Sequence, residues 1–327
     1  MIHQRISVAM LLGIAVLLSG YVVYEHVTDG DAVPWELQLN RHQRKVAGES
    51  PFYNPWQYRV LSTAVVQGAL DLTKATVPVL SPRVVFYGIH FLQILAICLL
   101  SVAYFRQLGV SNPMLQIVGL ILISYSMASS AYKSDLSFDT YFDVIAYLCA
   151  ALLILKERYV WVVPLMLLAA LNRETSGLIP LMILVPLGTS HPRMFARSRL
   201  IAVGAAMLVY GVAFVAVRWY FGLQPAVGIH GMTSASEYLW FNLSFARLVP
   251  LLLGTLSVVP LIVVWRLGQV HSVLRGWFWL IVPIWVVIHF LKSTVVETRL
   301  FLVPQIIIFV PAFLTLVERW YEDRITG

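Results

Sequence analysis

Long apolar runs dominate this chain and leave it few possible folds. Each run approaches the ~20 residues that a helix needs to cross the ~30 Å hydrocarbon core of a bilayer. Of the 327 residues, 59% are hydrophobic and only 12% charged, whereas a soluble domain carries about 25% charged residues. Lipid must therefore be the main solvent, and the predicted fold class is all-α, a polytopic transmembrane helix bundle. The runs cover residues 6–26, 84–105, 113–131, 139–155, 200–220, 248–265, 277–291 and 300–317.

The stretch 159–190 differs from the other runs because it has the polar cluster Asn172-Arg173-Glu174-Thr175 at its centre. One straight helix of this length would bury Arg173 and Glu174 at mid-membrane. We expect a broken helix pair, since irregular backbone at depth is tolerated where it lines a cavity. The pair brings the count to about ten spans in a single domain, 1–327, with both termini on the same side of the membrane.

Basic residues at the ends of the runs orient the bundle. The cluster Arg193, Arg197 and Arg199 lies in a short loop, where Lys and Arg mark the cytoplasmic side. Both termini are therefore predicted to be cytoplasmic in a bacterial inner (cytoplasmic) membrane. The first run is read as an uncleaved span, because it continues to about Tyr24 without a small-residue cleavage site.

The region 27–83 is the only long external loop. From Tyr58 to Lys74, apolar residues recur on one helical face. With Asp71 and Lys74 in the last turns, this pattern predicts an interfacial helix lying on the membrane surface. A true span over 58–80 is the alternative, and it would reverse the orientation of everything downstream.

Composition excludes several classes of protein. Cys98 and Cys149 both lie inside apolar runs, which excludes a disulfide framework or a zinc site. The sequence pI is about 9.5, but the bases stand at the ends of apolar runs, as they do in membrane proteins. We therefore expect contact with membrane phospholipid and no nucleic-acid partner.

Most of the 16 acidic residues fall at the outer ends of the predicted spans, with bases beside them. A bundle that gathers these ends would bring the groups together around one outward-facing cavity. The acids are Asp29, Asp31 and Glu36, then Asp135, Asp139 and Asp143, then Glu174 and Glu297; the bases are Arg59, Lys133, Arg173, Lys292 and Arg299.

Such a set suits the transfer of a sugar from a lipid phosphate. A carboxylate takes the proton of the acceptor hydroxyl, and Arg, Lys or a metal held by carboxylates stabilises the departing phosphate. Each residue also has a simpler interpretation. Asp29 and Asp31 would form a solvated turn, Arg59 would reach phospholipid headgroups, and Arg173 with Glu174 would be a local pair at a helix break.

Several short motifs carry a family resemblance. They are an acid soon after the first span (Asp29 or Asp31), the run Ala47-Gly48-Glu49-Ser50-Pro51-Phe52-Tyr53 ahead of Tyr58-Arg59-Val60-Leu61-Ser62, then Leu171-Asn172-Arg173-Glu174-Thr175, and Glu297-Thr298-Arg299. In these motifs and in its layout the chain resembles the GT-C superfamily of polytopic glycosyltransferases, nearest to the compact bacterial membrane enzymes of the GT87 type and to related polysaccharide-cluster proteins.

The resemblance implies an inverting glycosyltransferase of the cell envelope that uses a polyprenyl-phosphate sugar at the periplasmic face. It implies a catalytic aspartate in the first external loop, for which Asp31 is the first choice and Asp29 the second. The acceptor would be a glycan or a lipid, and a divalent cation, Mg²⁺ or Mn²⁺, is left open. The candidate substrate-binding residues are Tyr58, Arg59, Asp139, Arg173, Glu174, Glu297 and Arg299.

Two other classes stay open. A transporter or flippase of lipid-linked saccharides would use the same buried arginines and acids as a binding site and gate. A polysaccharide polymerase or ligase would also use periplasmic arginines, with 222–247 as its later external loop. No internal repeat of the kind that favours transport is visible in the sequence.

Overall fold

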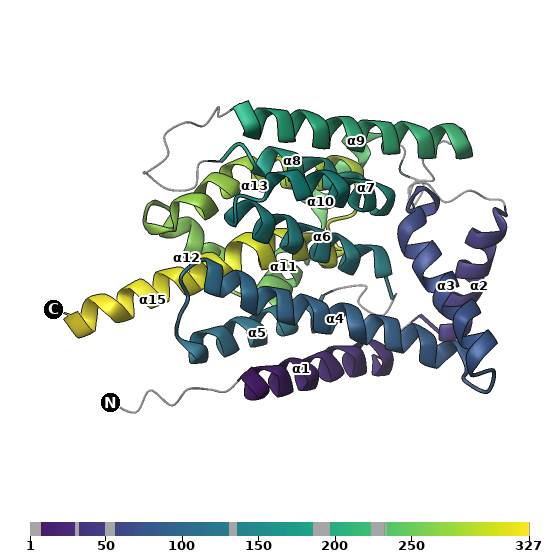
Figure 1. Cartoon of the computed structure of the whole chain (residues 1–327), viewed down its shortest axis with the longest axis horizontal. Coiled ribbons are helices and arrows are strands. Elements are labelled where there is room, and N and C mark those ends of the chain that lie inside the picture. Colours follow the sequence, from purple (N-terminus) through teal and green to yellow (C-terminus); the bar gives the residue numbers. More distant parts are fainter. Residues whose placement is uncertain are drawn as a thin grey trace.

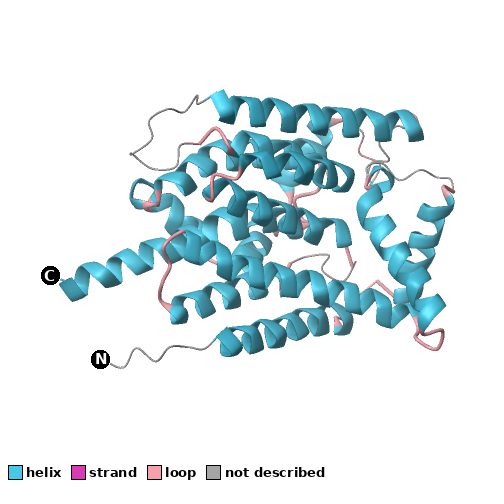
Figure 2. Cartoon of the chain, in the orientation of Figure 1, coloured by secondary structure: helices cyan, strands magenta, loops and turns pink. Residues whose placement is uncertain are grey.

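The computed structural model describes residues 8–29, 33–49, 56–130, 136–185, 197–223, 232 and 234–326. Within these ranges the regular structure is helical and no strand is found (Figure 2). Several helices are long and apolar enough to cross a membrane by length and composition, which indicates a membrane protein. The six candidates are α1 (Val8–Thr28), α4 (Pro82–Gln107), α6 (Phe138–Leu155), α9 (Arg197–Phe221), α13 (Ser272–Lys292) and the final segment Thr298–Arg324.

The predicted count of about ten spans is not confirmed. The candidates number six, or seven if α10 and α11, bent by 81°, form one broken span. The predicted span at 248–265 is split because Ser257 has a φ of 56° and Pro260 lies in the first turn of the next helix. The shorter apolar helices are α5 (Pro113–Ala128), α7 (Val162–Asn172), α8 (Ile179–Met182), α10 (Ala235–Ser244), α11 (Leu248–Leu256) and α12 (Val259–Trp265).

The two ends of the described chain lie at the same end of the bundle. Figure 1 shows α1 beginning and α15 (Val310–Thr326) ending on the left, while α2 (Trp35–Ala47) and α3 (Val60–Thr76) lie on the right. Both of these helices run across the bundle axis rather than along it, and α3 contacts α4, α6 and α7. Neither is among the candidate spans. This arrangement is the one expected of helices that cover one mouth of a transmembrane bundle.

The final segment is the most enclosed of the candidate spans, with 78% of its apolar window buried. It runs through η6 (Thr298–Phe301), α14 (Leu302–Pro304) and the wide turn η7 (Gln305–Phe309) into α15. In such a wide turn, some backbone groups lose the hydrogen bonds of a regular α-helix. Tyr104 compensates by donating from its hydroxyl to the Ile307 carbonyl at 2.8 Å, and the Gln305 amide donates to the Leu256 carbonyl at 3.0 Å. These bonds fix the start of the segment beside the site described below.

The polar cluster at 172–175 lies at a break in the backbone. Helix α7 ends at Asn172, Arg173 is extended with φ −158° and ψ 146°, and the tight turn η3 (Glu174–Leu178) follows. The Ser176 hydroxyl donates to the Arg173 carbonyl at 2.7 Å. Since a break inside a bundle leaves backbone groups without helical partners, such side-chain bonds are required to hold it.

Two tyrosines from neighbouring helices complete the break. The Tyr147 hydroxyl of α6 donates to the Thr175 carbonyl at 2.6 Å, and the Tyr210 hydroxyl of α9 donates to the Glu174 carbonyl at 2.8 Å. Gly177 permits this approach, because a Cβ at that position would lie 2.9 Å from Cζ of Tyr210. The backbone of Glu174 is thereby set between α6 and α9.

Candidate functional site

A cavity of about 510 Å³ opens where several helix ends meet, a size typical of ligand pockets. Its walls come from η1 (Trp56–Tyr58) and the start of α3, the start of α6, the break after α7, the ends of α9 and α13, and η6. Five basic side chains and three carboxylates line it, so cations are in excess. They are Arg59, Arg173, Arg218, Lys292 and Arg299, with Asp139, Glu174 and Glu297.

Six of the seven predicted substrate-binding residues line this one cavity: Arg59, Asp139, Arg173, Glu174, Glu297 and Arg299. The seventh, Tyr58, lies just behind the wall, where its hydroxyl donates to the Gly222 carbonyl at 2.7 Å. The predicted base is not among the lining residues. Asp29 follows the end of α1, which contributes no residue to the cavity, and Asp31 lies outside the described residues, as do Lys133 and Asp135.

Arg59 is the central cation of the site. It precedes α3 and is only 9% exposed. Its guanidinium donates to Asp139 of α6 at 2.5 Å and to Glu174 at 3.5 Å. A buried arginine is tolerated when carboxylates and hydrogen bonds offset its desolvation. The fold therefore keeps Arg59 charged at the cavity wall, although its partners lie 80 and 115 residues away.

The half-buried Lys45 of α2 approaches Arg59 from outside the cavity. Its ammonium donates to the Arg59 carbonyl at 3.3 Å. Burial lowers the pKa of Lys45 to about 8, despite the opposing attraction of Asp139. Helix α2 thus places beside the site a charge that is lost in mildly alkaline solution.

Arg173 is more deeply enclosed and has its own partners. It is 4% exposed, donates to the Thr140 hydroxyl at 3.2 Å, and has its Nε 4.0 Å from an Asp143 oxygen. The Thr175 hydroxyl donates to the same Asp143 oxygen at 3.0 Å. In addition, the Asn172 amide donates to the Asp139 carbonyl at 2.8 Å. This network joins the break after α7 to α6. It therefore holds the positively charged guanidinium of Arg173 in a fixed position at the cavity wall.

Glu297 and Arg299 close the opposite side. Their side chains pair at 3.1 Å, and Thr294 donates to the second Glu297 oxygen at 3.3 Å. Arg299 also donates to the hydroxyl of Ser137, which precedes α6. The amide side chain of Asn242, on α10, holds the turn before this pair by donating to the Ser293 carbonyl at 2.9 Å and accepting from the Val295 amide at 2.8 Å.

Arg218, near the end of α9, is a site residue that the sequence did not predict. Its Nη2 lies 3.6 Å from Glu174, and its guanidinium stacks 3.4 Å from the ring centre of Phe214 and 4.7 Å from that of Tyr58. In the sequence it precedes Trp219 and Tyr220, a pattern typical of an interfacial aromatic belt. The only available signal was that an arginine stood at the outer end of a span.

Lys292, at the end of α13, is exposed at the mouth and lines the cavity. It makes no hydrogen bond or ion pair with any residue that the structure describes. Every arginine of the cavity, in contrast, is paired with at least one carboxylate. Lys292 is therefore the cation left over for an anionic ligand.

The carboxylates present do not fit a divalent cation. Each one that lines the cavity is already shared with an arginine, so its oxygens face a positive charge that competes with a metal. In the described ranges no group of three or more His, Cys, Asp or Glu side chains is placed to hold a metal ion.

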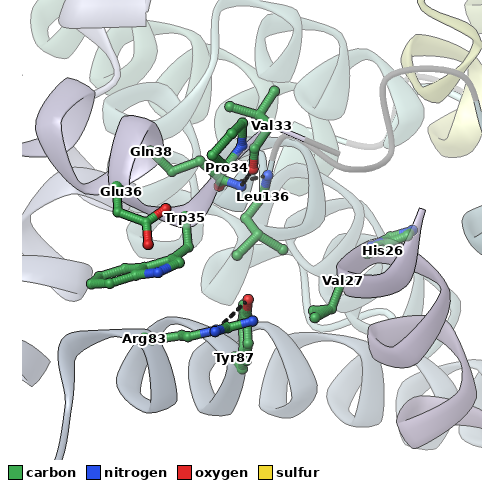
Figure 3. A pocket seen from close by; sticks show the side chains of 10 residues that line it. All are labelled: His26, Val27, Val33, Pro34, Trp35, Glu36, Gln38, Arg83, Tyr87 and Leu136. Carbon is green, nitrogen blue, oxygen red and sulfur yellow. Dashed lines mark hydrogen bonds between the residues drawn. The ribbon is translucent and has the colours of Figure 1, made fainter. Parts of the chain in front are cut away.

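A second, smaller cavity of about 220 Å³ lies between the end of α1, the start of α2 and the start of α4. Figure 3 shows Trp35 and Glu36 from α2 facing Arg83 and Tyr87 of α4. The Arg83 Nε donates to the Tyr87 hydroxyl at 3.0 Å, and Arg83 and Glu36 are exposed. This is the cavity nearest in sequence to the predicted bases, yet it does not contain the buried arginines.

No protein-family model matches this chain, and no curated protein or solved structure matches it. The chemistry of the cavity of about 510 Å³, called the arginine-lined cavity below, follows from its own side chains.

Proposed function

We propose that this chain is a membrane glycosyltransferase that moves a sugar from a polyprenyl-phosphate donor to an acceptor, a glycan or a lipid, within the arginine-lined cavity. The observation that supports it is the convergence of five cations and three carboxylates at one mouth of an apolar bundle. Cations in excess suit a phosphate, carboxylates suit an acceptor hydroxyl, and an apolar bundle suits a lipid tail.

The cations would act on the leaving phosphate. When the bond between sugar and phosphate breaks, negative charge grows on the phosphate oxygen, and fixed positive groups around it stabilise the transition state. Arginine suits this role because its fork of N–H donors matches phosphate geometry. Arg59 and Arg173 are held in place by Asp139 and Asp143, so little reorganisation would be needed as the charge develops.

The cavity would open to the periplasm. Its lining elements lie at the end of the bundle opposite to the start of α1 and the end of α15 (Figure 1). Cytoplasmic termini, predicted from the basic cluster 193–199, would then place the cavity outside. In a chain with Cys98 and Cys149 replaced by alanine, an impermeant thiol reagent should label Ser50→Cys in intact cells and leave Ser198→Cys unlabelled. The reverse labelling pattern would move the cavity to the cytoplasm.

The transfer itself is tested with the purified full chain in lipid nanodiscs. A panel of polyprenyl-phosphate sugars with radiolabelled sugars is offered with lipid and glycan acceptors, and labelled product is separated from donor. We expect product with at least one donor, and Arg59→Gln should abolish it. Absence of product across the panel would count against transfer.

A lipid-linked saccharide flippase is the second candidate, because charged groups at a broken helix pair also suit a transporter's binding site. The same preparation in sealed vesicles separates the two functions. Movement of a labelled polyprenyl-phosphate sugar between leaflets, without any transfer to an acceptor, would replace the enzyme by a transporter.

A further inference from the structure

Glu174 differs from the other carboxylates of the cavity in its exposure. Its side chain is 28% exposed, against 12% for Asp139 and 11% for Glu297. Its backbone is fixed by the break after α7 and by the bond from Tyr210, so its carboxylate is presented to the cavity from a rigid base. Glu174 is therefore the carboxylate that a substrate reaches most readily.

Glu174 also has the weakest ties to its cations. It lies 3.5 Å from Arg59 and 3.6 Å from Arg218, whereas strong charge-assisted bonds measure ~2.7–2.9 Å. Arg59 holds Asp139 at 2.5 Å. A phosphate could therefore take the two loosely held donor groups from Glu174 while Arg59 stays anchored by Asp139.

The positive charge of Arg218 is balanced by Glu174. Among the described residues Glu174 is the one carboxylate that pairs with Arg218. The guanidinium also stacks on the rings of Phe214 and Tyr58, and its Nη1 donates to the Phe214 carbonyl at 3.4 Å. These contacts hold the guanidinium in place while its Nη2 is directed to a single, distant carboxylate. Such a guanidinium is positioned to exchange that partner for the donor's phosphate, a diester with one negative charge that gains a second as the sugar leaves.

We propose that Glu174 accepts the proton of the acceptor hydroxyl and that the donor's phosphate activates it by taking over Arg59 and Arg218. This inference rests on the proposed function and deepens it. Before the donor binds, the carboxylate is engaged with both arginines. After it binds, the cations turn to the phosphate, and Glu174 becomes a free base beside the reacting sugar.

The bond changes balance without a further reactant. The acceptor oxygen bonds to the anomeric carbon of the sugar as the bond from that carbon to the phosphate oxygen breaks. The electron pair of the broken bond stays on the phosphate, and the proton of the acceptor passes to Glu174. When the polyprenyl phosphate leaves, Glu174 releases the proton to water, and Arg59 and Arg218 pair with it again.

The test is Glu174→Gln in the full chain, with two readouts. A base typically contributes 10²–10⁴-fold to rate, so turnover of the panel donors should fall at least a hundredfold. Binding of farnesyl phosphate, which carries the phosphate and no sugar, should tighten at least threefold because the competing carboxylate is gone. The acid limb of the pH–rate profile should disappear in Glu174→Gln and persist in Glu174→Asp.

A merely structural Glu174 gives the opposite binding result. If it only held the two arginines in place, glutamine would loosen them and farnesyl phosphate would bind more weakly, which would overturn the inference. Turnover within threefold of wild type would overturn it as well. If wild type transferred no sugar at all, the proposed function and the proton role would fail together. Tighter binding by Glu174→Gln would then still support the exchange of arginines.

Discussion

The small cavity and the arginine-lined cavity contain the same kinds of side chains but hold them differently. In the small cavity near the end of α1, Arg83 and Glu36 are exposed, and Arg83 bonds to a neutral tyrosine one turn away in its own helix. In the arginine-lined cavity, Arg59 joins Asp139 and Glu174, which belong to other helices. The first arrangement is an ordinary solvated surface. The second holds charged groups in a poorly solvated space, where electrostatic interactions are strongest.

The difference separates two kinds of candidate for the base. Asp29 and Asp31 stand next to a span end, which drew attention to them, but the cavity takes no residue from α1. Glu174 stands in the middle of an apolar stretch, where an ionisable group is costly and is functional by default. The place of Glu174 in an apolar stretch is thus a reason for proposing it that is independent of the cavity.

The largest difference between the two cavities is expected in how much a substitution lowers the free energy of unfolding. Asp139→Asn keeps the shape but leaves Arg59 with one distant carboxylate, and breaking a buried pair costs about 3–5 kcal/mol. The variant should unfold several degrees earlier in detergent. The matched change Glu36→Gln in the small cavity should stay within about 0.5 kcal/mol of wild type. Equal losses in the two variants would remove the distinction between the cavities.

A tenfold contrast is expected in phosphate binding. Arg59→Lys and Arg173→Lys keep the charge but lose the fork of donors, so each should weaken farnesyl phosphate binding about tenfold, or ~1.4 kcal/mol. Arg83→Lys, the control from the small cavity, should bind as wild type does. If Arg83→Lys alone weakened binding, the phosphate site would belong near α1.

The sequence predicted most of the charged residues that line the arginine-lined cavity, but not which of them form ion pairs. Arg59, Asp139 and Glu297 stand at the outer ends of apolar runs, so any bundle would gather them at one mouth, as the structure does. Arg218 was missed because its place on the cavity side depends on how α9 is rotated about its own axis. The apolar residues of α9 do not mark a single face, so the sequence does not define that rotation. The split at Ser257 combines a positive φ with Pro260 in the first turn of the next helix, and only the proline was visible in the sequence.

A smaller effect, about threefold, is expected from pH. Burial lowers the pKa of Lys45 to about 8, so the lysine is mostly charged at pH 7 and mostly neutral at pH 9. A phosphate monoester stays dianionic over this range, since its second pKa is ~6. Its affinity should therefore fall as pH rises, by about 0.6 kcal/mol for one nearby, partly screened charge.

Lys45→Arg keeps the charge and should flatten this dependence. Asp139, Arg59 and Glu174 are the charged groups that face Lys45. An unchanged slope in Lys45→Arg would assign the titration to another group.

The smallest effect is expected from the segment that follows α1. Asp29 lies beyond the end of α1 and outside the lining of the arginine cavity, and Asp31 follows two residues later. If Glu174 is the base, Asp29→Asn and Asp31→Asn should each keep turnover within threefold of wild type. Both substitutions preserve size and polarity, so stability should hardly change. The measurement is transfer from the best donor of the panel, at saturating donor and acceptor, beside Glu174→Gln from the same preparation.

The opposite result would be equally informative. A hundredfold loss in Asp31→Asn, ~2.7 kcal/mol of transition-state stabilisation, would mean that the loop carries its carboxylate into the cavity when substrate is bound. Glu174 would then position Arg59 and Arg218 without accepting a proton. A loss in both Asp31→Asn and Glu174→Gln would be resolved by the pH–rate profile, because only the group that takes the proton removes the acid limb when it is replaced by an amide.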